Sequence, residues 1–249
     1  IICIDSKKIK KIFNKIRNKN ILTYGESKNA NYQISNIRYN VDYSIFDISY
    51  KDIKKRSKRI SNIQLSLLGK HNVLNGAAAV AVCLNLGINQ KVIKKSLRKY
   101  SGVQRRMTKI FSKNQNDFYD DYAHHPTEIT SILEGVRNVY KKRKIVSIFE
   151  PHRYSRVISL KKNFSNSFSN SDVVLLCPMY AAGEKKNQKY DQIKFAKLIS
   201  KFSKTQVILI RDKNQIKEYL KKNLISNEIV IGMGAGLISK WMNELKTDL

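Results

Sequence analysis

The sequence has no long apolar run and few cysteines, and each scarcity excludes a class of protein. No stretch approaches the roughly 20 consecutive apolar residues of a membrane-spanning helix, so we predict a soluble, cytoplasmic protein without a membrane partner. The three cysteines, Cys3, Cys83 and Cys177, lie far apart within apolar stretches. This placement is typical of buried free thiols in a reducing compartment and argues against disulfides or a zinc site.

The chain also lacks an initiator methionine and the basic-then-apolar layout of a secretion signal. It opens directly on a strand pattern at Ile1–Asp5. We therefore expect it to begin in the middle of a larger polypeptide. Its 249 residues are enough for one large core or two modest ones.

Acidic residues are scarce, with 19 Asp and Glu against 48 Lys and Arg, which gives a formal net charge of +29. This excess raises the alternative of a basic nucleic-acid-binding protein, because clustered cations bind phosphates. The lysines, however, are spread over nearly every predicted helix, together with abundant Ile and Asn, and no recognised binding motif accompanies them. A solvated basic surface is the preferred interpretation, so nucleic acid is not an expected partner.

The first hundred residues are dominated by strand patterns, with one early helix over residues 6–17. Two further helices, 71–86 and 90–99, follow on either side of Gly87 and close this part of the chain. The predicted strands are Ile1–Asp5, Ile21–Tyr24, Tyr32–Tyr39 and Ile63–Leu68.

From Tyr100 onward strands and helices alternate regularly, without an internal repeat or a low-complexity segment. Repeated units of this kind favour an α/β domain with a mostly parallel sheet covered on both faces, and we predict a Rossmann-like domain over residues 100–249. The clearest helices are 126–139 and 157–168, and another is expected from about Tyr190. The predicted strands are Met107–Phe111, Phe118–Asp120, Ile145–Phe149, Val173–Cys177, Val207–Ile210 and Ile229–Ile231.

Two polar segments, Asp120–Glu128 and Glu150–Arg156, each follow a short apolar strand and precede a helix. In an open parallel sheet the carboxyl ends of the strands form the edge where ligands bind. The segments gather carboxylates, imidazoles and guanidiniums at that edge. We therefore expect a site of chemistry there.

The residue types in the first segment leave several interpretations open. Asp120 and Asp121 beside a His pair suit a metal site, a general acid–base site or a grip on ribose and phosphate, and spacing does not choose between them. Only His71 and His152 remain as further histidines, which disfavours a dedicated metal site. A purely structural alternative is a His-Pro turn that caps the next helix, aided by residues 127 and 128.

Arg153 and Arg156 stand three residues apart at a predicted helix start, so both can face one side and bind a carboxylate or phosphate. Pro151 and His152 fix the turn before them, although a simple pair of surface arginines is the alternative.

Two further segments carry weaker signals. His71 and Asn75 share a helix face, and Asn72 suits either a cap or the edge of adenine. Gly232–Gly236 has the layout of a phosphate cradle, but it belongs to the last strand-helix unit, so close helix packing is the favoured interpretation.

Together, seven ordered segments that span essentially the whole chain resemble the Mur ligase family. The most specific, Pro151–Arg156, favours the member that adds L-alanine over the one that recycles cell-wall tripeptide, which stays the alternative. The segments are Tyr24-Gly25, Gly69–Asn75, Gly102–Arg106, Asp120–Glu128, Glu150–Arg156, Tyr180–Glu184 and Gly234–Gly236.

The resemblance implies that residues 1–99 end a central ATPase domain and that residues 100–249 form the C-terminal Rossmann-like domain. It implies ATP-dependent joining of L-alanine to UDP-N-acetylmuramate through an acyl phosphate, in the synthesis of peptidoglycan precursors. The phosphate-binding loop, the ligands for Mg²⁺ and the UDP site are expected upstream. Without those missing segments, which are its expected partners, the chain should be inactive.

The resemblance also implies roles for individual residues, and it places no metal ligand in this chain. Arg106 is favoured over Arg105 for the nucleotide. Departures from the family pattern are Ala123, Val157, Leu237 and Glu150, and Glu150 would add negative charge beside the arginine pair in a direction that the sequence does not give. The implied ATP-binding residues are His71, Asn72, Asn75, Arg106 and Asp121, and the implied alanine pocket is Tyr122 with His124, His152, Arg153 and Arg156, the last four being catalytic.

Overall fold

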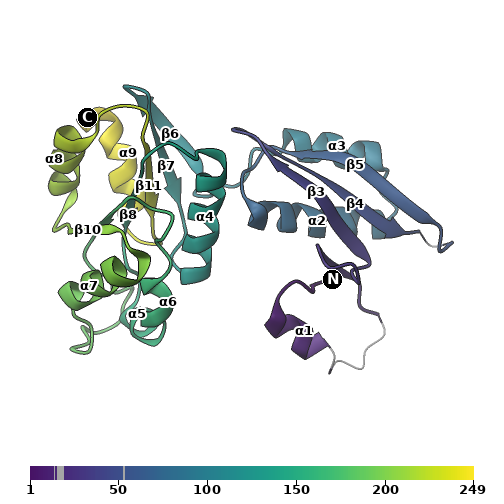
Figure 1. Cartoon of the computed structure of the whole chain (residues 1–249), viewed down its shortest axis with the longest axis horizontal. Coiled ribbons are helices and arrows are strands. Elements are labelled where there is room, and N and C mark those ends of the chain that lie inside the picture. The colour runs from purple at the N-terminus through teal and green to yellow at the C-terminus, as the bar shows by residue number, and fades with distance from the viewer. Residues whose placement is uncertain (14, 16–19, 53) are drawn as a thin grey trace. The chain divides into compact units, whose positions relative to one another are not determined.

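The computed structural model describes residues 1–13, 15, 20–52 and 54–249 (Figure 1). The chain forms two compact units, Ile1–Gly102 and Val103–Leu249, which are described separately. Across the described ranges, no helix is both long and apolar enough to cross a membrane. The three cysteines are free, as predicted, although only Cys177 is fully buried.

The first unit is built on a five-stranded sheet in which the strands follow one another in chain order. β1, β2 and β3 pair in parallel, whereas β3, β4 and β5 form an antiparallel meander. Helix α1 (Lys7–Phe13) connects the first two strands, and the rest of the helix predicted there lies partly outside the described residues. The strands are β1 (Ile2–Cys3), β2 (Thr23–Gly25), β3 (Tyr32–Tyr39), β4 (Ser44–Lys51) and β5 (Ser57–Leu65).

The sequence prediction missed β4, and its bulges explain why. The pairing register shifts between Ser35 and Arg38 on one side and between Phe46 and Ile48 on the other. As a result Phe46, Asp47 and Ile48 are all buried, and the strict alternation that marks a half-buried strand is lost.

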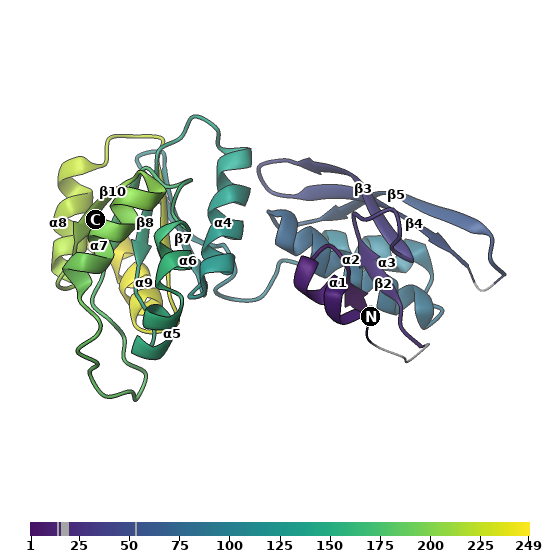
Figure 2. The same ribbon diagram turned by 60° about the horizontal axis from the view of Figure 1, so that its bottom comes forward.

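Helices α2 (Lys70–Asn85) and α3 (Gln90–Lys99) cover one face of this sheet (Figures 1 and 2). Val73, Ala77 and Val80 of α2 are fully buried against the strands. Small side chains let a helix approach a sheet closely, which explains the Ala-rich, apolar character of α2. The predicted helix over 90–99 is confirmed to the residue.

The second unit contains a six-stranded sheet of order β10-β9-β8-β11-β7-β6. All neighbours pair in parallel except β6 and β7, which form an antiparallel hairpin. The mostly parallel sheet predicted for this part is therefore confirmed. Its strands are β6 (Thr108–Lys113), β7 (Asn116–Asp121), β8 (Ile145–Phe149), β9 (Val173–Leu176), β10 (Gln206–Leu209) and β11 (Ile229–Met233).

Helices cover both faces of this sheet, as Figure 1 shows. One face packs against α4, α6 and α7, and the other packs against α8 and α9. Every residue of β8 and β11 is buried, as expected for central strands of a doubly covered sheet. The helices are α4 (Pro126–Val139), α5 (Tyr154–Ser159), α6 (Lys161–Ser165), α7 (Gln192–Ser203), α8 (Lys213–Asn223) and α9 (Ile238–Asp248).

The prediction of a single helix over residues 157–168 was wrong. The helical segment begins earlier, at Tyr154, and breaks at Leu160, whose backbone leaves the helical region with φ −109° and ψ 19°. The break lets Phe164 and Phe168 reach the core beside Phe149. Burial of these large rings, at roughly 2 kcal/mol or more each, outweighs the lost helical turn.

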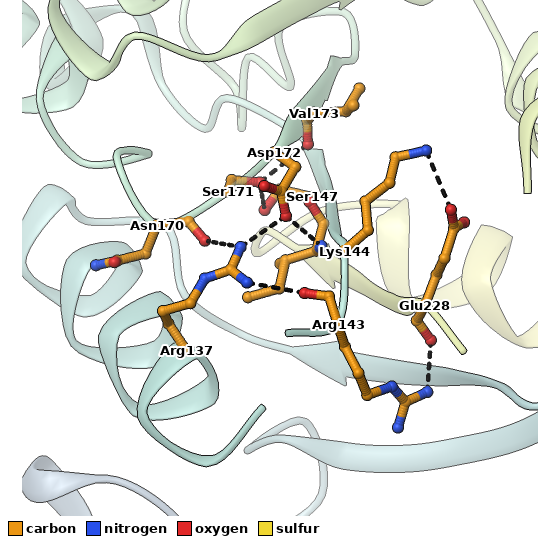
Figure 3. A network of polar contacts seen from close by, with 10 residues as sticks. Arg137, Arg143, Lys144, Ser147, Asn170, Ser171, Asp172, Val173 and Glu228 are labelled. Atoms are coloured by element: carbon orange, nitrogen blue, oxygen red, sulfur yellow. Dashed lines mark hydrogen bonds and ion pairs between the residues drawn. The ribbon is translucent and has the colours of Figure 1, made fainter. Parts of the chain in front are cut away.

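A network of hydrogen bonds and ion pairs connects the amino ends of the strands in this unit (Figure 3). Asp172 accepts hydrogen bonds from the guanidinium of Arg137 at 2.6 Å and from the backbone of Ile145 at 2.7 Å. Arg143 donates to the carbonyl of Glu228 at 2.7 Å and to the carboxylate of Asp117 at 2.5 Å. These contacts fix the sheet at the edge opposite the polar segments.

Candidate active site

The two polar segments leave the sheet at the same level. Strand β11 lies between β7 and β8, and its Met233 is in register with Asp121 on one side and with Phe149 on the other. The residues that follow β7 and β8 therefore emerge side by side at the carboxyl edge. The sequence-predicted gathering of polar side chains at one edge is thus present in the structure.

Asp121 is a buried anchor at the end of β7, with 1% of its surface exposed. Its Oδ1 accepts a hydrogen bond from the backbone of Ala123 at 2.7 Å, and its Oδ2 accepts one from Met107 at 2.8 Å. Burial raises the pKa of this carboxyl to about 6, although both backbone donors oppose the shift. Asp121 thus fixes the turn into the site; its contact with a nucleotide stays a prediction.

Buried Asp120 and half-buried Arg105 form a second polar pair beside it. Asp120 accepts a hydrogen bond from Ser239 Oγ at 2.5 Å, and Arg105 Nε lies 3.7 Å from its Oδ2. Burial raises the pKa of Asp120, and these two partners oppose the shift. Arg105 also donates to the carbonyl of Gly234 at 2.7 Å, whereas Arg106, favoured from sequence, is exposed.

Arg105 also supports Tyr122 of the predicted alanine pocket. The guanidinium carbon lies 4.7 Å from the centre of the Tyr122 ring, and the Tyr122 backbone donates to the Arg105 carbonyl at 2.8 Å. The preference for Arg106 came from the family resemblance, and contact of Arg106 with a nucleotide stays a prediction.

His124 is held from two sides. Its Nδ1 lies 2.8 Å from the carbonyl oxygen of Tyr122 and 3.8 Å from the carboxylate of Glu128. Glu128 also accepts hydrogen bonds from the backbones of His124 and His125, at 3.1 and 3.2 Å. The ring of His124 is therefore fixed to the start of α4.

The His-Pro turn caps helix α4, as the structural alternative predicted. His125 is the N-cap of α4, its Nδ1 accepting from Thr127 at 3.3 Å, with Pro126 in the first turn and Glu128 completing a capping box. The capping side chain is His125 rather than Thr127. His125 is thus a structural residue and His124 is the one that faces the cluster.

His152 lies at the centre of a row of rings. The row runs from Tyr122 through His124 and His152 to Tyr180, with centroid separations of 5.0, 5.6 and 5.5 Å. Arg156 Nη1 lies 3.1 Å from His152 Nδ1. Burial, followed by the charge of Arg156, lowers the pKa of His152. The structure thus brings Tyr122, His124, His152 and Arg156 together.

Arg153 occupies a special backbone position at the same place. It is the N-cap of α5 with φ +69°, and its side chain is exposed. Whether the two guanidiniums share one anion stays a prediction.

Tyr180 and Glu184 also contact this site, although neither was a predicted site residue. Segment 151–153 pairs with Tyr180, since Tyr180 N donates to the Pro151 carbonyl at 2.8 Å and the Tyr180 carbonyl accepts from Arg153 N at 2.9 Å. Glu184 accepts from the backbone and hydroxyl of Ser155, at 2.9 and 2.5 Å. The sequence signal for them was the segment Tyr180–Glu184, which is one of the seven segments that resemble the Mur ligase family.

Glu150 does not face the arginine pair, which answers the question that its sequence position left open. Its carboxylate is 3% exposed and accepts hydrogen bonds from the backbones of Leu237 and Ile238, at 3.1 and 3.3 Å, at the start of α9. Burial raises its pKa against the pull of these donors. Gly236 makes room for it, because an added Cβ would lie 2.5 Å from Glu150 Oε2.

The glycine segment is therefore a packing element, as the sequence favoured. An added Cβ at Gly232 would lie 2.3 Å from Met242 of α9. The backbone donors that open α9 already serve the Glu150 carboxylate. This leaves no empty phosphate cradle at the start of that helix.

The predicted adenine residues lie in the first unit, at the start of α2. Asn72 is buried, and its Nδ2 donates to the carbonyl of Leu68 at 2.8 Å. It does not cap α2, because the N-cap is Gly69 and no side chain caps this helix. His71 is half-buried and Asn75 is exposed. Contact of these three with a nucleotide stays a prediction.

Nowhere in residues 1–13, 15, 20–52 and 54–249 do three His, Cys, Asp or Glu side chains gather closely enough to hold a metal ion. The carboxylate oxygens of Asp121 and Glu150 accept hydrogen bonds from backbone N–H groups.

Comparison with known proteins gives consistent matches along the chain. Residues 105–236 match the family model described as Mur ligase, glutamate ligase domain, and residues 1–83 match the Mur ligase middle domain. A UDP-N-acetylmuramate–L-alanine ligase from Pelagibacter ubique is 46% identical over 98% of this chain and 53% of its own length. One from Hydrogenobaculum is 36% identical over 98% of this chain and 52% of its own.

Solved structures agree on the fold. The crystal structure of the UDP-N-acetylmuramate–alanine ligase from Thermotoga maritima aligns with a TM-score of 0.72 at 22% identity, covering 91% of this chain and 47% of that one. A murein peptide ligase from Psychrobacter arcticus aligns with a TM-score of 0.66 at 21% identity, covering 100% and 50%. The chain spans about half the length of the curated relatives that it matches. It belongs to the Mur ligase family and carries residues of that family's middle and glutamate ligase domains.

Proposed function

We propose that the chain is the part of an ATP-dependent ligase that brings L-alanine to UDP-N-acetylmuramate in the cytoplasm. The observation that carries the proposal is the convergence of His124, His152 and Arg156 at one sheet edge. The segment that holds them lies within the region shared with relatives named UDP-N-acetylmuramate–L-alanine ligase. The reaction would form an amide through an acyl phosphate made from ATP.

The alanine pocket would be Tyr122, His124, His152, Arg153 and Arg156. A guanidinium suits the alanine carboxylate because its N–H groups form charge-assisted, paired hydrogen bonds. Holding the amino acid by its carboxylate fixes where its amine lies, and such fixation turns a bimolecular attack into a pre-oriented one. The ring row from Tyr122 to Tyr180 would form the wall beside the small side chain.

The nucleotide would be bound by His71, Asn72, Asn75, Arg106 and Asp121. In this proposal residues 1–99 end the middle domain and residues 100–249 form the third domain. Mg²⁺ would be held by ligands outside this chain. A bound Mg²⁺ would supply charge stabilisation to the transferring phosphoryl group.

The test is a chimera in which this chain replaces the matched 244-residue segment of the Pelagibacter ubique relative. We expect phosphate release that needs ATP, UDP-N-acetylmuramate and L-alanine together. No release with all three present, from a chimera that is folded and binds ATP, would contradict the proposal.

The tripeptide-recycling ligase is the second candidate, and the same chimera separates the two. Cell-wall tripeptide offered in place of L-alanine should give no product. Product from tripeptide but not from L-alanine would favour the recycling reaction.

A further inference from the structure

The hydrogen bonds of His124 determine which of its nitrogens carries the proton. Its Nδ1 faces the carbonyl oxygen of Tyr122 at 2.8 Å, and a carbonyl oxygen only accepts hydrogen bonds. Nδ1 must therefore be the N–H nitrogen, and the carboxylate of Glu128 at 3.8 Å favours the same arrangement. In the neutral ring, Nε2 then carries the lone pair.

His152 has the opposite arrangement. Its Nδ1 faces Arg156 Nη1 at 3.1 Å, and a guanidinium only donates. Nδ1 must accept, so the proton of the neutral ring is on Nε2. Burial and the nearby positive charges lower the pKa of His152, which favours the neutral ring. Tyr180 stacks on it with an interplanar angle of 14° and fixes its plane.

The two rings are neighbours, with centroids 5.6 Å apart, and one offers an acceptor where the other offers a donor. A zwitterionic α-amino acid has the matching pair of groups, an ammonium that donates and a carboxylate that accepts. The two-histidine pair is thus complementary to the head group of an amino acid.

Building on the proposed function, we propose that His124 Nε2 is the base that takes the proton from the ammonium of the incoming amino acid, while His152 Nε2–H helps to hold its carboxylate. In this step an N–H bond of the ammonium breaks, the proton bonds to His124 Nε2, and the electron pair stays on the nitrogen. The amine then forms a C–N bond with the acyl phosphate carbon. The C–O bond to the phosphate breaks, and its electron pair leaves with the phosphate. A second N–H bond of the former ammonium breaks as the amide forms, and this proton passes to the leaving phosphate, which departs as hydrogen phosphate.

The surroundings of His124 suit a base that becomes positively charged. Glu128, from α4, faces the protonated Nδ1 and is placed to stabilise the imidazolium, in the manner of an orienting carboxylate behind a catalytic histidine. The other titratable groups that face it are Tyr122 in the same turn and His152 from the segment after β8. Arg153 and Arg156 lie by His152, and their charges help to lower its pKa.

The test uses the chimera and its His124→Gln variant with two nucleophiles. L-alanine needs a base at neutral pH, whereas hydroxylamine is already unprotonated and attacks an acyl phosphate without one. We expect His124→Gln to lower kcat with L-alanine by about 100-fold, and to leave hydroxamate formation from hydroxylamine, ATP and UDP-N-acetylmuramate unchanged. Raising the pH should partly restore the alanine rate, because more of the amine is then free.

His125→Asn is the matched control, since it changes the adjacent histidine but keeps a side chain that caps α4. It should retain the parental rate with both nucleophiles. Parental kcat with L-alanine in His124→Gln would overturn the proposal, and so would an equal loss with both nucleophiles. Absence of hydroxamate from the parent chimera itself would instead count against the proposed function.

Discussion

Arg156 illustrates how one residue serves both structure and binding. Its guanidinium Nη1 lies 3.1 Å from Nδ1 of His152 and 3.5 Å from the His152 carbonyl oxygen, and a guanidinium carries five N–H donors in all. Arg153, three residues earlier, is exposed and reaches the same edge from a turn with positive φ. Lysine at either position would keep the charge but lose the planar fork.

For the arginine pair we predict that Arg153→Ala and Arg156→Ala in the chimera each raise the KM for L-alanine by roughly 30- to 100-fold, the cost of losing charge-assisted hydrogen bonds. The KM for ATP should change little. Steady-state kinetics with each substrate varied in turn measures both effects. Unchanged alanine kinetics in both variants would remove these residues from the pocket.

Asp121 gives a prediction about stability and pH. Its pKa is raised to about 6 in the folded protein, so the folded state holds this proton more tightly than the unfolded state does. The stabilisation is complete below the unfolded pKa and is lost as the pH rises through about 6. Between pH 5 and 7.5 the Asp121 contribution to the unfolding free energy should fall by roughly 1.4 kcal/mol.

Urea unfolding of the parent and of Asp121→Asn across that pH range measures this contribution as a difference. Asp117→Asn is the matched control on the same strand. Burial acts to raise the pKa of Asp117, but Lys109, Ser112 and Arg143 hold it below its usual value. Its stabilisation is present above the unfolded pKa, so the parent-minus-variant difference should stay flat from pH 5 to 7.5. A flat difference for Asp121→Asn as well would contradict the prediction.

At the scale of elements, the start of α9 and the loop at Tyr180 are joined through one glycine. An added Cβ at Gly236 would lie 2.5 Å from Glu150 Oε2 and 2.6 Å from the Tyr180 ring. We expect Gly236→Ala to lower the unfolding free energy by roughly 2–3 kcal/mol, and to raise the KM for L-alanine by moving Tyr180 off His152.

Gly183→Ala is the comparison for this variant, because its added Cβ meets nothing within 4 Å. It should cost only about 1 kcal/mol, which is the strain of a side chain at positive φ. Thermal or urea unfolding gives the ranking. Equal losses in the two variants would mean that the contact at Gly236 relaxes without cost.

The helices and strands show how much of the fold can be predicted from the sequence. Strands β3 and β8 and helices α3 and α4 were predicted to the residue, because regular apolar periods, a cap or a glycine stop mark their ends. Strand β4 was missed because its bulges put neighbouring residues on one buried face. The helix break at Leu160 was missed because it depends on how Phe164 and Phe168 pack against Phe149. That packing cannot be predicted from the local sequence pattern.

For the candidate site, the sequence located the edge but not the directions of its side chains. The histidines and Arg156 were grouped correctly, since strand ends of a parallel sheet meet at one edge. The turning of Glu150 toward α9, 87 residues away in the chain, depends on the order of strands in the sheet. So does the bond between Glu184 and Ser155 across 29 residues.

At the scale of the whole molecule, the net charge of +29 is the dominant feature. Like charges this dense repel one another most in the compact state, and salt screens the repulsion. We predict that raising NaCl from 20 mM to 300 mM, over which range the Debye length falls from about 20 Å to about 6 Å, raises the Tm by a few degrees. Calorimetry measures it.

Choline chloride at equal ionic strength should give the same rise as NaCl, since screening does not depend on the cation. A Tm that stays constant or falls with salt would mean that attraction among the ion pairs outweighs the repulsion.

The place of β11 has a consequence for how the protein is made. This strand lies between β7 and β8, yet it is synthesised after every other strand of its sheet. A growing chain on the ribosome therefore holds β7 and β8 with facing edges unpaired until Ile229–Met233 emerges. We expect the half-made domain to be a chaperone client, and the histidine cluster to assemble in one late event, so that a prematurely terminated product carries all its residues but never brings them together.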